Sequence, residues 1–256
     1  MDILHAVILG IVEGLSEFLP ISSTGHLILT AQVLKLPHTD FLKSFEIAIQ
    51  LGAILSVVVL YFKSLLTDLR IIKKLLAAFI PTAITGLAFY KLIKGLLLGN
   101  GHIVVWSLLI GGAFLVIFEL LHKENRSAPD DVAAISYKQA IFIGFFQSIA
   151  MIPGVSRSAA TIIGGLLLGL KRKAIVEFSF LLAVPTMLAA TMLDLSKSAD
   201  TFSRDQFTLL FCGFITSFVV ALFSIKFLLG FIKKHSFISF GVYRILIALL
   251  FLFWSL

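Results

Sequence analysis

Two stretches of this chain, residues 3–35 and 137–170, are apolar at both ends but broken in the middle by Pro, Gly, Ser and charged residues. Each apolar half has only about 10–15 residues, whereas a helix needs roughly 20 residues to cross a bilayer. Non-helical backbone at membrane depth is tolerated only where protein buries it or where it lines a wet cavity. We therefore expect two re-entrant helix-loop-helix hairpins, with their loops inside the protein.

The remainder of the chain has the composition of a membrane protein. Apolar residues make up 59% and charged residues 14%, and the mean hydropathy is +1.06. Soluble domains have about 45–50% apolar and about 25% charged residues. Six predominantly apolar runs reach the length of a membrane crossing. They are residues 44–62, 75–94, 102–121, 174–194, 207–230 and 237–256.

The formal charge of +7 comes from Lys and Arg residues that stand singly or in short runs between apolar segments. This distribution is typical of topology determinants and argues against a nucleic-acid partner. One expected face carries about twice as many of these residues as the other and is predicted to be cytoplasmic. Both termini and the mouth of the first hairpin then face outward. The N-terminus shows no signal-peptide pattern, and the single Cys212 predicts no intrachain disulfide.

The two broken stretches match each other without gaps at an offset of 134 residues, as from Ala6 to Ala140. Glu13 then pairs with Gln147, and Ser22 pairs with Ser156. Each half would hold one hairpin and three crossings, and this odd number inverts the second half in the membrane. We expect an all-α polytopic membrane protein with an inverted-topology repeat, six transmembrane helices and two hairpins. The single membrane domain, 1–256, would comprise repeat 1 (1–125), a linker (126–136) and repeat 2 (137–256).

Glu13 and Glu17 are four residues apart, so on a helix they share one face and their charges repel. At membrane depth such a pair needs a cation, or one carboxyl must stay protonated. Two converging carboxylates suit Mg²⁺ or Ca²⁺. The alternative is that both side chains point into a wet outward vestibule.

Hydroxyl residues follow the break in each stretch and resemble helix N-caps. A helix N-terminus is a ready site for anions, and Arg157 at the second break is suited to bidentate contact with phosphate. If the two loops meet, they form a site for a polyanion such as a diphosphate. Arg157 could alternatively pair with Glu13 or Glu17. The candidate diphosphate ligands are Ser22, Thr24, Ser156, Arg157 and Ser158.

Two further residues could take part in catalysis. His26 lies close to the hydroxyls and carboxylates and could act as a general acid or base. Ser23 could be a nucleophile if a base reaches it, although the sequence does not choose between Ser23 and its neighbouring hydroxyls. Residues expected around this centre are Glu46, Gln50 and Gln147.

At these residues the chain resembles the undecaprenyl-diphosphate phosphatase family, the bacitracin-resistance membrane proteins of bacteria. The resemblance covers essentially the whole chain. It is most specific over the stretch from Glu13 to His26 and over the stretch from Pro153 to Ser158. The segment from Phe45 to Gly52 also matches. The family usually has Gly after Ser-Arg-Ser, where this chain has Ala159.

The resemblance implies hydrolysis of undecaprenyl diphosphate to the monophosphate carrier that peptidoglycan synthesis reuses, and thereby cell-wall, cell-shape and bacitracin-resistance roles. It implies a divalent cation and a bacterial inner-membrane location with the site facing outward. By this resemblance Glu13 and Glu17 would be the acidic metal-binding or catalytic pair. Ser23 would be the nucleophile, His26 its partner, and Ser156 and Arg157 the diphosphate ligands.

A transporter or lipid flippase is the rival function, because inverted repeats with broken helices are a transporter architecture. Translocation alone does not need a nucleophile, acids and an Arg around one point, and this concentration favours hydrolysis. The expected partners are a polyprenyl diphosphate and the bilayer, and a homodimer is one candidate assembly.

Overall fold

The computed structural model describes residues 1–37, 39–89, 101–125, 127–198 and 204–254. Within these ranges the regular secondary structure consists of α-helices and one 3-10 helix, η2 (Val132–Ala134), with no β-strand. Five of the described helices are long and apolar enough to cross a membrane, so the chain is a multi-pass membrane protein. They are α3 (Asp40–Leu60), α5 (Leu69–Ala88), α7 (Gly101–Leu121), α10 (Arg172–Ser198) and α11 (Arg204–Phe231).

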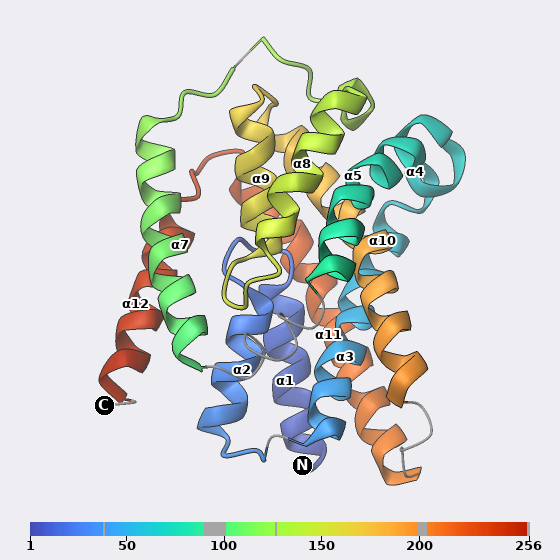
Figure 1. The fold of residues 1–256 in the computed structure, drawn as a ribbon, viewed down its shortest axis with the longest axis vertical. Helices are drawn as coiled ribbons and strands as arrows, with labels where there is room; N and C mark the ends of the chain where they lie inside the picture. Colours follow the sequence, from blue (N-terminus) through green and yellow to red (C-terminus); the bar gives the residue numbers. More distant parts are fainter. Residues whose placement is uncertain (38, 90–100, 126, 199–203, 255–256) are drawn as a thin grey trace.

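The two broken stretches form the predicted helix-loop-helix hairpins. The first consists of α1 (Ile3–Ser16) and α2 (Ser23–Val33), and the second of α8 (Tyr137–Ile149) and α9 (Arg157–Leu167). In Figure 1 the first hairpin rises from the lower end of the bundle to its middle and returns, and the second descends from the upper end and returns. The loops thus lie at mid-height, and re-entry into a bilayer stays a prediction.

Helices from the two halves of the chain pack against each other. α1 lies along α11, α8 lies along α5, and α3 packs against α10. Glycines allow the close approaches: a Cβ at Gly14 would lie 2.6 Å from the carbonyl oxygen of Ser217 on α11. A Cβ at Gly144 would lie 2.1 Å from the carbonyl oxygen of Ala78 on α5. Gly10 and Gly14 form a Gly-x-x-x-Gly in α1, and a Cβ at Gly10 would likewise lie 2.7 Å from the carbonyl oxygen of Gly213 on α11, so this spacing serves helix packing.

Helix α12 (Ile238–Trp254) pairs with α7, and together they form one side of the bundle (Figure 1). α12 is apolar, but its described part is shorter than the five spans. It corresponds to the run predicted at 237–256. Residues 90–94 of the run predicted at 75–94 lie outside the described residues. The other predicted runs coincide with long helices to within a few residues.

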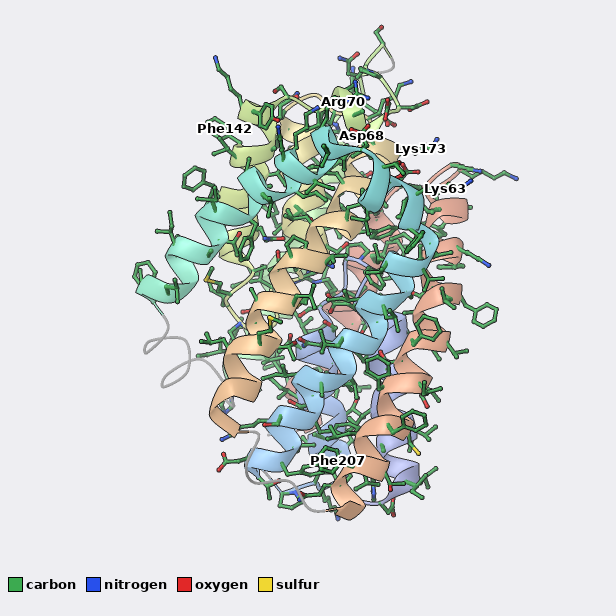
Figure 2. All side chains as sticks on the ribbon, turned by 90° about the vertical axis from the view of Figure 1, so that its right-hand side faces the viewer. Lys63, Asp68, Arg70, Phe142, Lys173 and Phe207 are labelled. Atoms are coloured by element: carbon green, nitrogen blue, oxygen red, sulfur yellow. The ribbon has the colours of Figure 1, made fainter. Side chains whose placement is uncertain are left out.

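The two ends of the bundle differ in character. Both chain termini lie towards the lower end in Figure 1. Lys63, Asp68, Arg70 and Lys173 gather at the opposite end in Figure 2. The predicted linker lies at this same end, where the Nζ of Lys74 donates to the carbonyl oxygen of Ala133 (2.6 Å). The sequence predicted that the termini lie on one side and the more basic loops on the other, and this arrangement agrees with that prediction.

Substituting Gly14→Ala is expected to destabilise the protein by about 1–3 kcal/mol, because the added methyl would press against the backbone of α11. Gly230→Ala, on α11, is a matched control because a Cβ there meets nothing within 4 Å. Thermal unfolding in detergent measures the difference. Equal midpoints for the two variants would show that α1 and α11 do not pack as described.

Candidate active site

The two loops meet at a buried ion pair between the halves of the chain. Arg157, the first residue of α9, donates from Nη2 to Oε1 of Glu17 at 3.2 Å and from Nε to the same oxygen at 3.4 Å. Glu17 directly follows α1, and both side chains are at least nine-tenths buried. The sequence left open, as an alternative, that Arg157 pairs with Glu13 or Glu17; it does pair with a carboxylate, and the partner is Glu17.

The second oxygen of Glu17 accepts a hydrogen bond from the hydroxyl of Ser23, the first residue of α2. Glu17 therefore lies between the guanidinium and the hydroxyl. A carboxylate that accepts the hydrogen of a Ser hydroxyl can act as its base. The structure thus pairs Ser23 with Glu17 rather than with His26.

Side-chain caps fix the start of each second helix. The Oγ of Ser22 caps α2 by accepting from the N–H of Gly25 (3.4 Å), and the Oγ of Ser156 caps α9 by accepting from the N–H of Ala159 (3.1 Å). Both caps follow the sequence prediction. Ala159 needs no glycine, because its φ is not positive. Ser22 has φ 75°, a strained value for a non-glycine residue, and such strain concentrates at functional sites.

Other groups hold Arg157 from the opposite side. Its Nη1 donates to the carbonyl oxygen of Ser179 on α10 (2.8 Å), and the Ser179 and Thr161 hydroxyls are 2.6 Å apart. Helix α10 thereby orients the guanidinium towards the first loop. Sequence analysis missed Ser179. The repeat could have pointed to Ser179. Phe45 matches Phe178, so Ser179 stands at the position that Glu46, a predicted site residue, has in the first half.

Glu13 is completely buried one turn before Glu17. Among the described residues no N–H or O–H group donates to either of its carboxylate oxygens. The charged groups that act on it are Glu17, Glu46 and Arg157. Three carboxyl groups thus lie near one guanidinium, and such a cluster needs either a further cation or a protonated carboxyl.

This donor set fits a divalent cation. The described residues contain no group of three or more His, Cys, Asp or Glu side chains arranged to hold a metal ion by themselves. Mg²⁺ is commonly held by one or two carboxylates together with phosphate oxygens and water. The unpaired oxygens of Glu13, with Glu17 beside it, match that arrangement.

His26 lies in the first turn of α2, but both of its ring nitrogens are engaged elsewhere. Nδ1 lies 2.7 Å from the carbonyl oxygen of Ser22, so it carries the hydrogen. Nε2, 2.9 Å from the hydroxyl of Tyr243 on α12, then accepts in the neutral ring. The two rings also stack, with centroids 5.5 Å apart. Tyr243 is a second neighbour of the site that sequence analysis missed.

The other residues predicted for the site do not take part in the Arg157–Glu17 ion pair. The hydroxyl of Ser158 donates to the carbonyl oxygen of Phe18 (2.8 Å), so it joins the loops. The amide of Gln147 donates to the hydroxyls of Thr82 (2.9 Å) and Thr186 (3.1 Å), on α5 and α10. Thr24 and Gln50 are half-buried, on α2 and α3 respectively.

Comparisons with known proteins cover nearly the whole chain. The family model described as bacitracin resistance protein BacA matches residues 6–250. A relative from Aquifex aeolicus, named undecaprenyl-diphosphatase, is 59% identical over 96% of each chain. Proteins of the same name from Sulfurihydrogenibium sp. (53% identical, 99% of this chain and 100% of the relative) and Persephonella marina (52% identical, 100% of each) also match.

Substituting Arg157→Met is expected to cost about 3–5 kcal/mol of stability, because it leaves Glu17 buried without its partner. The matched control is Arg70→Met, which removes an exposed pair with Asp68 and should lower the unfolding midpoint far less. Thermal unfolding of the two purified variants tests this. A loss no greater than that of the control would contradict a buried Arg157–Glu17 pair.

Proposed function

This chain belongs to the family of bacitracin resistance protein BacA, and we propose that its undecaprenyl-diphosphatase reaction takes place at the buried junction of the two loops. The reaction removes the terminal phosphate of undecaprenyl diphosphate and leaves the monophosphate carrier lipid. The observation that carries the site assignment is the contact of Glu17 with both Arg157 and Ser23.

Ser23 is the proposed nucleophile. Its hydroxyl already donates to Glu17, so Glu17 can take the proton as Ser23 Oγ attacks the terminal phosphorus. The bond between this phosphorus and the bridging oxygen breaks, and undecaprenyl phosphate leaves. Water then hydrolyses the phosphoserine and releases inorganic phosphate. His26 is less suited to attack because Ser22 and Tyr243 engage both of its nitrogens.

The anion is held by Arg157 and by the N-terminal ends of α2 and α9. Free N–H groups and the positive end of the dipole favour phosphate at a helix start. The caps Ser22 and Ser156 mark these two starts, and Thr24 follows the first of them. The guanidinium suits the two oxygens of one phosphate and the charge that develops during transfer.

Glu13 and Glu17 would hold a divalent cation, Mg²⁺ or Ca²⁺, together with diphosphate oxygens and water. When bound, the cation would neutralise phosphate charge and polarise the phosphorus–oxygen bond. The full burial of Glu13 without a hydrogen-bond donor supports this role. Glu46 lies near Glu13 and would support the cation from α3.

We further propose the inverted repeat with six crossings, α12 being the sixth. The packing of the helices supports this repeat. The repeat relates α1 to α8 and α11 to α5, and α1 lies on α11 just as α8 lies on α5. Two further packed pairs, α3 with α10 and α7 with α12, join equivalent helices. The hairpins also point in opposite directions (Figure 1). With the basic end in the cytoplasm, the first hairpin opens to the outer face of the bacterial inner membrane.

The flippase alternative is not favoured. The similar proteins are named as a diphosphatase, and the junction contains a hydroxyl bonded to a carboxylate, which translocation does not require. Movement of a labelled lipid across proteoliposomes by a Ser23→Ala variant would support that alternative if it equalled movement by the wild type.

The purified protein is expected to release phosphate from undecaprenyl diphosphate in detergent with Mg²⁺ or Ca²⁺. Ser23→Ala should lower kcat at least about 10³-fold, and Glu17→Gln about 10²–10⁴-fold. Ser56→Ala is the matched control, because that buried hydroxyl bonds only within α3, to the carbonyl oxygen of Ala53. Phosphoserine at position 23, trapped by acid quench and found by mass spectrometry, identifies the nucleophile. Full activity of Ser23→Ala would contradict the assignment.

Removal of divalent cations by a chelator is expected to abolish phosphate release, and added Mg²⁺ should restore it. Glu13→Gln should raise the Mg²⁺ concentration for half-maximal activity about 10–100-fold. Glu177 lies on α10 near Lys173, at the end of the bundle opposite the chain termini. Glu177→Gln is therefore the control and should leave this Mg²⁺ concentration unchanged. Undiminished activity of the chelated wild type would overturn the cation requirement.

A further inference from the structure

Arg244 on α12 is a buried cation that the proposed chemistry does not use. Its side chain is 1% exposed, although it lies within an apolar helix. None of the ion pairs among the described residues involves it. A buried charge in such a place is costly and by default marks a functional role.

The guanidinium of Arg244 instead donates to backbone carbonyl oxygens. Nη1 donates to Pro20 (3.4 Å), and Nη2 donates to Gly154 (3.0 Å) and to Ser107 on α7 (3.1 Å). The Pro20 and Gly154 carbonyls lie outside helices, in the two loops, whereas Ser107 lies within α7. One side chain therefore contacts both loops and α7 at once.

The two loop positions are equivalent to each other. Pro20 and Gly154 are separated by the same 134-residue offset that relates Ala6 to Ala140. Pro20 lies three residues before Ser23, and Gly154 lies three residues before Arg157. The guanidinium thus joins the backbone just ahead of the proposed nucleophile to the backbone just ahead of the phosphate-binding Arg.

The surroundings leave room for this side chain. Gly111 on α7 faces it, and a Cβ there would lie 2.2 Å from Nη2. Gly154 has φ 89°, and a Cβ there would lie 2.6 Å from the carbonyl oxygen of Val104. The second loop therefore rests directly on α7, beside the guanidinium.

We infer that Arg244 is a positioning residue that sets the spacing of the two loops and so aligns Ser23 with a diphosphate held by Arg157. This inference rests on the proposed function of the junction. A displacement of about 1 Å at a reacting centre can reduce the rate about 100-fold. Loss of the guanidinium should therefore lower kcat, while the groups that bind the lipid remain.

The first test compares the steady-state kinetics of the wild type with those of Arg244→Met and Arg244→Lys. Arg244→Met should lower kcat about 100-fold and change KM less than about threefold. Arg244→Lys, which keeps a charge and three donors, should recover at least about a tenth of the wild-type kcat. Arg172→Met is the control: it removes a buried pair with Glu119 and should leave kcat within about threefold.

The second test retains Arg244 but displaces its guanidinium by a substitution on α7. Gly111→Ala should displace the guanidinium and lower kcat at least about tenfold without unfolding the protein, because only the end of a flexible side chain must shift. Gly101→Ala on the same helix, where the nearest atom would be 3.8 Å away, should have no such effect. This variant decides the question if Arg244→Met does not fold.

Wild-type kcat in folded Gly111→Ala, or in folded Arg244→Met, overturns the inference. A raised KM with unchanged kcat also overturns it, because Arg244 would then bind the lipid directly. If the wild type itself releases no phosphate, the proposed function fails instead, and the two failures are thereby distinguished.

Discussion

The ion pair between Glu17 and Arg157 is the contact on which the organisation of the site depends. The two residues stand 140 positions apart, each beside a broken helix that would not be stable in a bilayer by itself. Their pairing compensates two buried charges and places a Ser hydroxyl next to a carboxylate. Ser158, which donates to Phe18, ties the same loops at a second point. The polar loops are therefore stable at this depth because they cover each other.

The two hairpins have similar shapes but supply different chemistry. The first brings Glu13, Glu17 and Ser23, and the second brings Arg157. At the position of Glu13 the second half has Gln147, whose amide is bound by hydroxyls of α5 and α10. A neutral residue there needs no cation. We propose that the charge of the metal site is thus confined to the first half, while the second half supplies the positive charge for the phosphate.

Much of this arrangement could be predicted from the sequence. Breaks in apolar stretches predicted both hairpins, and hydroxyl residues after the breaks predicted both caps. A carboxylate partner for Arg157 was only one alternative, and the sequence did not choose between Glu13 and Glu17. The pairing of Ser23 with Glu17 rather than His26 could not be predicted, because it depends on side-chain directions in the loop. The contacts of Tyr243 and Arg244 depend on the packing of α12, which lies more than 200 residues further along the chain.

The central claim, that the two loops form one reaction centre, is tested most directly by a double-mutant cycle on kcat. The cycle compares Glu17→Gln, Arg157→Met and the double variant with the wild type. Residues that act as one unit have strongly non-additive effects. We predict that the double variant is no slower than the slower single variant, within about threefold. A double variant whose loss equals the product of the two single losses would contradict the account.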